Sequence, residues 1–206
     1  MTVLTVIFFI GSVLASGCVQ VLPDPGAPAK RLVLEPTFEA LEQGRSKALS
    51  IAVARPTASE LYESKRLIIK THQEAVMKVD YIAGVEWQDI LPTLVQRDIV
   101  RGLEKAHYFK GVGFQEERFK QDILLEVDIR HFEGVVTSQD QYAHVVFGIK
   151  AIRNPGRTVI LQTTIETKQP LLSRALDRLV EGLTQAYESA LIKMVRECGS
   201  LDQHHD

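Results

Sequence analysis

The sequence predicts a single α+β domain in which two long helices pack on one face of a mainly antiparallel sheet. Short segments between residues 31 and 168 alternate apolar and polar side chains with a period of two, which is typical of strands. The helical period of 3.6 residues occurs at 87–107 and again at 172–195. Strands, helix, strands and helix in this order favour an α+β arrangement, and the 189 residues that follow Gly17 suffice for one sizeable core.

The first 18 residues carry the pattern of an export signal. An apolar run over 2–10 is followed by small residues and then by Cys18. The run is shorter than the roughly 20 apolar residues that a membrane-spanning helix needs. Ala15-Ser16-Gly17 before the cysteine resembles the lipobox of bacterial lipoproteins, which implies cleavage between Gly17 and Cys18 and acylation of the Cys18 thiol. The alternative is a buried N-terminal element of a cytosolic protein, since no Lys or Arg precedes Lys30.

The export interpretation divides the chain into four parts. We expect a signal peptide at 1–17, a lipidated cysteine and flexible tether at 18–30, one periplasmic domain at 31–199 and a polar tail at 200–206. Three prolines and one glycine between Val19 and Lys30 favour an extended, weakly ordered tether.

Four short strands are predicted at the start of the domain. The first, 31–35, is closed by Pro36, and the second, 48–54, ends before Pro56. Segments 67–70 and 75–81 are separated by polar residues, and their alternation and β-branched content suggest a pair of antiparallel strands. In the last segment one face carries Met77, Val79 and Tyr81.

The pattern then changes to that of an amphipathic helix over 87–107. Pro92 lies near its start, where a missing amide costs least, and Asp89 is a candidate cap or first-turn acid. Gly111 and Gly113 are expected to break the chain after the helix.

Three clearer strands and the longest helix follow. The strands are expected at 122–130, 142–152 and 158–168, the last two joined by a turn at Asn154-Pro155-Gly156. The helix at 172–195 presents one apolar stripe, made of Leu172, Leu176, Leu179, Val180, Leu183, Tyr187, Ala190, Leu191 and Met194.

No motif in the sequence predicts an enzyme. G-x-S-x-G, H-E-x-x-H and a glycine-rich phosphate loop are absent from the sequence. Asp122, Glu126 and Asp128 alternate with apolar residues, so a solvated sheet face explains them better than a carboxylate cluster. We therefore expect no catalytic residue, no cofactor and no metal. The net charge of −2, with 24 basic and 26 acidic residues, gives no attraction to nucleic acid.

The two cysteines agree with export. Acylation of Cys18 leaves Cys198 as the single thiol, so no disulfide forms within the mature chain and the apolar core must hold the fold. Cys198 is expected to be a small, partly buried residue near a helix end.

Trp87 and Tyr81 are the candidate partner-binding residues. A lone Trp at a helix start commonly packs beneath the first turn, and that is the plain interpretation of Trp87. The functional interpretation is an exposed aromatic anchor, because Trp is enriched in the centres of interfaces.

These features occur in an order that resembles a known family. The lipobox cysteine leads through the tether to a first strand; Tyr81 and Trp87 bracket the turn before the first helix, and Tyr108-Phe109-Lys110-Gly111-Val112 follows it. A strand with Val127-Asp128-Ile129-Arg130-His131-Phe132 and a long C-terminal helix complete the order. The chain thus resembles the ABC-type transport auxiliary lipoproteins, which include the lipoprotein of the paraquat-inducible intermembrane transport system.

The resemblance implies a non-enzymatic accessory subunit of a transporter that carries mammalian-cell-entry (MCE) subunits. Its partners would be an MCE-domain protein, an ABC permease and ATPase complex, and the membrane through the lipid anchor, with homo-oligomerisation left open. Val19 follows the cysteine where Asp would favour inner-membrane retention, so the implied location is the periplasmic face of the outer membrane. The alternative function is an envelope-assembly lipoprotein that supports a synthase or translocon.

Overall fold

The computed structural model describes residues 28–73 and 76–201. The predicted signal peptide, Cys18, most of the predicted tether and nearly all of the predicted polar tail lie outside these described residues, so what the sequence indicates about them stays a prediction. The described α-helices and β-strands, in chain order, are β1 (Lys30–Leu32), β2 (Lys47–Val53), β3 (Thr57–Ala58), β4 (Arg66–Gln73), β5 (Val76–Trp87), α2 (Leu91–Ala106), β6 (Phe109–Phe114), β7 (Ile123–Val136), β8 (Gln141–Arg153), β9 (Thr158–Pro170) and α3 (Leu176–Gly199).

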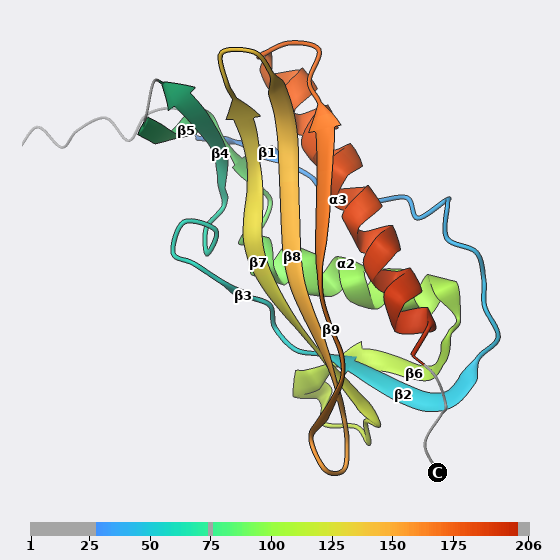
Figure 1. Cartoon of the computed structure of the whole chain (residues 1–206). Helices are drawn as coiled ribbons and strands as arrows, with labels where there is room; N and C mark the ends of the chain where they lie inside the picture. The colour runs from blue at the N-terminus through green and yellow to red at the C-terminus, as the bar shows by residue number, and fades with distance from the viewer. Residues whose placement is uncertain (1–27, 74–75, 202–206) are drawn as a thin grey trace, which may run out of the picture.

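The described strands form one nine-stranded sheet, and α2 and α3 lie on the same face of it (Figure 1). This confirms the α+β class. The sheet is mixed, however, because five of the eight strand pairings among the described residues are parallel. The expectation of a mainly antiparallel sheet is therefore corrected. Side-chain alternation is the same in both kinds of pairing, and strand direction depends on connections that local pattern does not encode.

Strand β7 is the axis of the sheet. It pairs antiparallel with β8 along its length. Its other edge is shared by β2, β3 and β4, all of which run parallel to it at successive positions. Strand β9 continues the sheet beyond β8, and the β8–β9 turn at residues 154–156 lies where the sequence predicts it.

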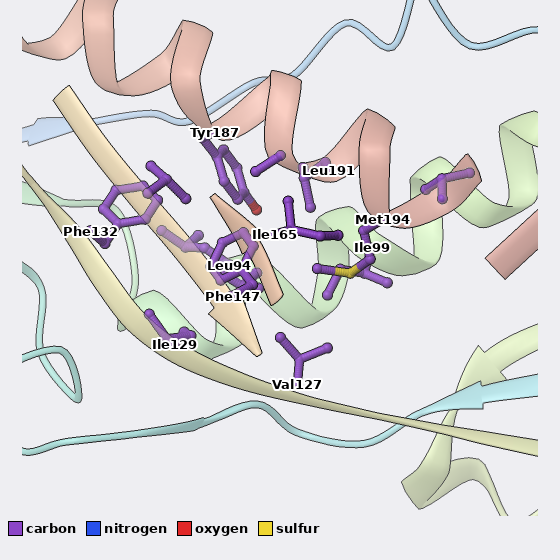
Figure 2. Close-up of a cluster of buried hydrophobic side chains, with 14 of the residues drawn as sticks. Leu94, Ile99, Val127, Ile129, Phe132, Phe147, Ile165, Tyr187, Leu191 and Met194 are labelled. Carbon is purple, nitrogen blue, oxygen red and sulfur yellow. The ribbon is translucent and has the colours of Figure 1, made fainter. Parts of the chain in front are cut away.

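The hydrophobic core lies between this sheet and the two helices. Figure 2 shows side chains from both layers meeting there. The sheet contributes Val127, Ile129, Phe132, Phe147 and Ile165, and the helices contribute Leu94, Ile99, Tyr187, Leu191 and Met194. Each is at most 5% exposed, so each contributes about 1.5–3 kcal/mol from burial of apolar surface.

Helix α2 begins later than the sequence predicts. Its first residue is Leu91, and Trp87 is instead the last residue of β5. Pro92 lies in the first turn as expected. Asp89 does not cap the helix, because its carboxylate accepts the backbone N–H of Ile90, and Ile90 is the N-cap without a side-chain capping bond.

Two further boundaries differ from the prediction. Gly111 and Gly113 do not break the chain; they lie inside β6, where a Cβ at Gly113 would collide with the Glu117 carboxylate and the Phe119 ring. Helix α3 begins at Leu176, so Leu172 of the predicted apolar stripe lies in the preceding loop and is 85% exposed. Apolar character alone does not distinguish a helical residue from an apolar loop residue beside it.

Candidate functional site

A bulge in β7 divides its side chains between the two faces of the sheet. The pairing register with β8 shifts between Ile129 and His131, which leaves Arg130 as an additional residue on β7. Phe132 packs in the core against Tyr187, with ring centroids 5.5 Å apart. Its neighbours His131 and Glu133 therefore lie on the face away from the helices, which we call the outer face.

Glu133 is the centre of a buried hydrogen-bond network on the outer face. Its side chain is 1% exposed. One carboxylate oxygen accepts the Tyr62 hydroxyl at 2.6 Å and the backbone N–H of Phe132 at 2.6 Å. The other oxygen lies 3.0 Å from the Lys70 ammonium and 2.8 Å from His131 Nδ1. Burial alone would raise the pKa of Glu133, but the Tyr62, His131 and Lys70 hydrogen bonds together lower it.

His144 extends this network across the sheet. Its ring stacks on His131 with centroids 4.7 Å apart, and its Nε2 lies 2.9 Å from a carboxylate oxygen of Glu166. Lys168 pairs with the same Glu166 oxygen at 2.9 Å. Burial lowers the pKa of His144, and the Glu166 hydrogen bond only partly offsets this effect. The network thus joins β4, β7, β8 and β9.

Three side chains of the network, His131, Glu133 and His144, are of the types that bind metal ions and lie close together. Donor atoms of His131, Glu133 and His144 all lie within 4.8 Å of one another. The Lys70 ammonium, however, is bound to the same Glu133 oxygen that would face the ion. A fixed positive charge at 3.0 Å opposes a divalent cation there, so the geometry favours a structural network.

A groove of about 560 Å³ lies beside the network on the outer face. We call it the outer groove; its charged and polar lining includes Arg55, Glu126, Asp128, Arg130, Lys150 and Thr164. Arg130 donates to Asp128 and to Thr164, both at 3.0 Å. A Cβ at Gly148 would collide with the Arg130 guanidinium, so this glycine provides the space in which Arg130 lies.

The structure separates the three predicted surface carboxylates. Glu126 and Asp128 line the outer groove with side chains 41% and 49% exposed, which agrees with a solvated sheet face. Asp122 lies outside it and accepts the backbone N–H of Ser50 at 2.8 Å, which ties β2 to the start of β7. The groove itself was not predicted, because its lining comes from strands whose adjacency depends on sheet order.

A second surface feature lies at the β4–β5 hairpin and is apolar. Its members are Val76, Met77, Val79 and Tyr81 of β5 together with Leu172 of the β9–α3 loop, and we call this set the apolar end. These side chains are 41–85% exposed. A pocket of about 240 Å³ lies between β5 and the start of this loop, and its lining includes Asp80 and Ile82 of β5 and Leu171 and Arg174 of the loop. Figure 1 shows both at one end of the sheet.

The two candidate partner-binding residues have different environments. Tyr81 is 44% exposed, and the Arg66 guanidinium lies over its ring, 4.6 Å from the centroid. Trp87 is 1% exposed and packs edge-on against Phe132 at 6.0 Å. The Trp87 indole therefore packs in the core, and the interpretation of Trp87 as an exposed anchor is wrong.

Cys198 behaves as a core residue. It is buried on α3, and burial raises the pKa of its thiol to about 12. In the described part of the chain, neither helix is long and apolar enough to cross a membrane. Cys18 and Gly17 lie outside the described residues.

Comparison with known proteins places the domain in a family. The family model for the ABC-type transport auxiliary lipoprotein component matches residues 32–195. No curated protein matches the sequence significantly.

Solved structures share the fold. The crystal structure of XCC0632 from Xanthomonas campestris superimposes with a TM-score of 0.72 at 17% identity, covering 81% of this chain and 93% of that one. The hypothetical protein CT253 from Chlamydia trachomatis gives a TM-score of 0.52 at 9% identity, covering 75% and 98%. At these identities the likeness concerns the fold alone.

Proposed function

Since this chain belongs to the ABC-type transport auxiliary lipoprotein components, we propose that it is a lipid-anchored periplasmic subunit of an MCE-type ABC transport system. In this role it assists the movement of lipids or hydrophobic compounds between the two membranes, and it performs no chemistry of its own. Acyl chains on Cys18 hold it at the membrane, with about 0.8 kcal/mol for each buried methylene.

The outer groove is the observation that carries a binding role. It is a concave surface on the sheet, and its charges are arranged as ion pairs, with Lys150 3.9 Å from Glu126 and Arg130 3.0 Å from Asp128. Charged groups of mixed sign can select a partner by electrostatic complementarity.

Strand β9 supports an extended protein segment as the occupant of the outer groove. Thr164 of β9 lines the groove, and within the described chain β9 pairs with β8 alone. The carbonyl of Glu166 on β9 accepts the Lys193 ammonium of α3 at 3.3 Å, so a partner segment would hydrogen-bond to the edge of β9 near Thr164, where its side chains reach the groove. We propose that this segment belongs to the MCE-domain protein.

Affinity capture of the full acylated protein from solubilised membranes, followed by mass spectrometry, tests the proposal. We expect recovery of an MCE-domain protein with its permease and ATPase. Lys150→Glu should reduce that recovery several-fold, because it reverses a charge in the groove. Arg178→Glu is the matched control: Arg178 is a basic residue on α3 that pairs with Glu181, and its side chain is 51% exposed, against 41% for Lys150. Recovery of only a synthase or translocon would replace the proposal with the envelope-assembly alternative.

A further inference from the structure

We infer that the apolar end is a membrane-contacting surface that lies against the leaflet in which the Cys18 acyl chains are embedded. This inference rests on the lipid anchor of the proposed function and adds a second, protein-mediated contact with the bilayer. It concerns a different surface from the outer groove.

The distribution of exposed apolar side chains is the first argument. The described residues include seven large apolar side chains that are exposed, and five of them belong to the apolar end. Leu172, the most exposed at 85%, comes from the β9–α3 loop, and the other four come from β5. Apolar side chains gathered at one end from two separate segments mark a surface that is covered in the working protein.

The direction of β1 is the second argument. β1 pairs parallel with β5, with Lys30 opposite Val85 and Leu32 opposite Trp87. Because β5 runs from its exposed end at Val76 toward Trp87, the chain enters β1 from the side of the apolar end. The described domain is thus joined to its anchor segment at the end that carries the exposed apolar side chains.

The length of the connection agrees with this placement. Cys18 precedes Lys30 by 12 positions in the sequence, a span of at most about 40 Å at 3.3–3.6 Å per residue. The part of β5 from Val85 back to Val76 covers roughly 30 Å at 3.3 Å per residue. The segment from Cys18 to Lys30 is therefore long enough to reach the Val76 end of β5. The acyl chains on Cys18 and the apolar end can then contact the same leaflet.

The polar residues at the apolar end suit a lipid headgroup region. Tyr81 has an apolar ring and a polar hydroxyl, the combination that is enriched at membrane interfaces. Lys78, Asp80 and Arg174 are exposed at the same end, and the two long basic side chains can extend to phosphate groups. A bilayer accepts apolar and basic groups together without requiring a matched protein surface.

Site-specific fluorescence on the full acylated protein tests the contact. Val79→Cys and Val159→Cys are each labelled with a nitrobenzoxadiazole group, and each protein is reconstituted into vesicles of phosphatidylethanolamine and phosphatidylglycerol. Val159 is the matched control, since it is a valine of similar exposure at the opposite end of the sheet beside the β8–β9 turn. The native Cys198 is buried and does not compete for the label.

We expect a blue-shifted emission at position 79 and at least about twofold stronger quenching by doxyl-labelled lipid than at position 159. Equal, weak quenching at both positions would overturn the membrane contact. A blue shift at position 79 without lipid quenching would also overturn it, and would assign the apolar end to a protein partner or a second copy. Palmitate labelling of the same preparation separates the two proposals: labelled protein without quenching contradicts only the contact, whereas unlabelled protein contradicts the anchor as well.

Discussion

The Tyr62 hydroxyl donates a 2.6 Å hydrogen bond to the buried carboxylate of Glu133, although the two residues are 71 positions apart in the chain. Tyr62 belongs to the segment between β3 and β4, and Figure 1 shows this segment beside β7, along the edge on which β3 and β4 pair with it. The bond therefore fastens this connecting segment to β7. It also supplies one of the donors that keep Glu133 charged while it is buried.

Tyr62→Phe should destabilise the fold by about 1.5–3 kcal/mol, because it removes a hydrogen bond to a buried charge. Chemical denaturation monitored by circular dichroism measures this change. Tyr142→Phe is the control, since Tyr142 contacts the network only through its ring, 5.9 Å from His144. A loss as large in the control would show that the hydroxyl of Tyr62 has no special role.

Tyr187→Phe should lower the free energy of unfolding by a similar amount, although Tyr187 lies on the opposite face of the sheet from Glu133. The Tyr187 hydroxyl donates to Asp98 at 3.1 Å and joins α3 to α2 in the core. Because the sheet separates the Tyr187 and Tyr62 sites, the double variant should lose the sum of the two single losses, to within about 0.5 kcal/mol. A loss in the double variant that is markedly smaller than this sum would reveal coupling between the two sites through β7.

The network predicts a stability that falls on acidification in two steps. Burial lowers the pKa of His144 below its ordinary value of 6.5, so the neutral ring is favoured in the fold. Its contribution is complete above pH 6.5 and is lost as the pH falls through the lowered pKa. The pKa of Glu133 is lowered below 4.5, so its contribution is complete above pH 4.5 and is lost as the pH falls further.

Thermal unfolding across the acid range checks both steps. His144→Gln should remove the upper step and leave the lower one. Glu133→Gln should remove the lower step, at a cost in stability at neutral pH because the Lys70 ammonium loses its charged partner. A wild-type profile that stays flat between pH 7 and pH 5 would contradict the assignment of His144.

Trp87→Ala should reduce the free energy of unfolding by about 3–5 kcal/mol, because it leaves a cavity beside Phe132 in the core. Tyr81→Ala should cost at most about 1 kcal/mol, since the ring is half exposed and loses chiefly its contact with Arg66. Denaturant titration of the two variants compares them directly. Loss of partner capture by Trp87→Ala at unchanged stability would contradict the buried position.

Metabolic labelling with palmitate should mark the wild type and not Cys18→Ser, because serine has no thiol to form the thioether. Wild-type protein of full precursor mass without label would refute the lipoprotein interpretation.

Density fractionation should place the protein with outer-membrane markers. Val19→Asp should shift it toward the inner membrane in bacteria where Asp after the acylated cysteine causes inner-membrane retention. Co-sedimentation of the wild type with inner-membrane markers alone would refute the outer-membrane location.

Local pattern predicted most of the elements and part of the candidate surfaces. The alternation of Met77, Val79 and Tyr81 correctly placed these side chains together on one face of a strand, since alternation is a property of the strand itself. The short strands β3 and β6 were missed. β3 has only two residues, and the glycines of β6 resemble a loop unless the neighbouring β2 is known.

Residues close together in the chain were enough to predict the α+β class, the two amphipathic helices, the β8–β9 hairpin and the family resemblance. The three-dimensional fold was needed for the strand directions, for the choice between the two interpretations of Trp87, and for the network of Tyr62, Lys70, Glu133 and His144. The pairing of strands depends on contacts between residues far apart in the chain. Burial of a carboxylate costs free energy unless hydrogen-bond donors surround it, and here those donors come from other elements of the fold. A periodic pattern read along the chain contains neither of these facts.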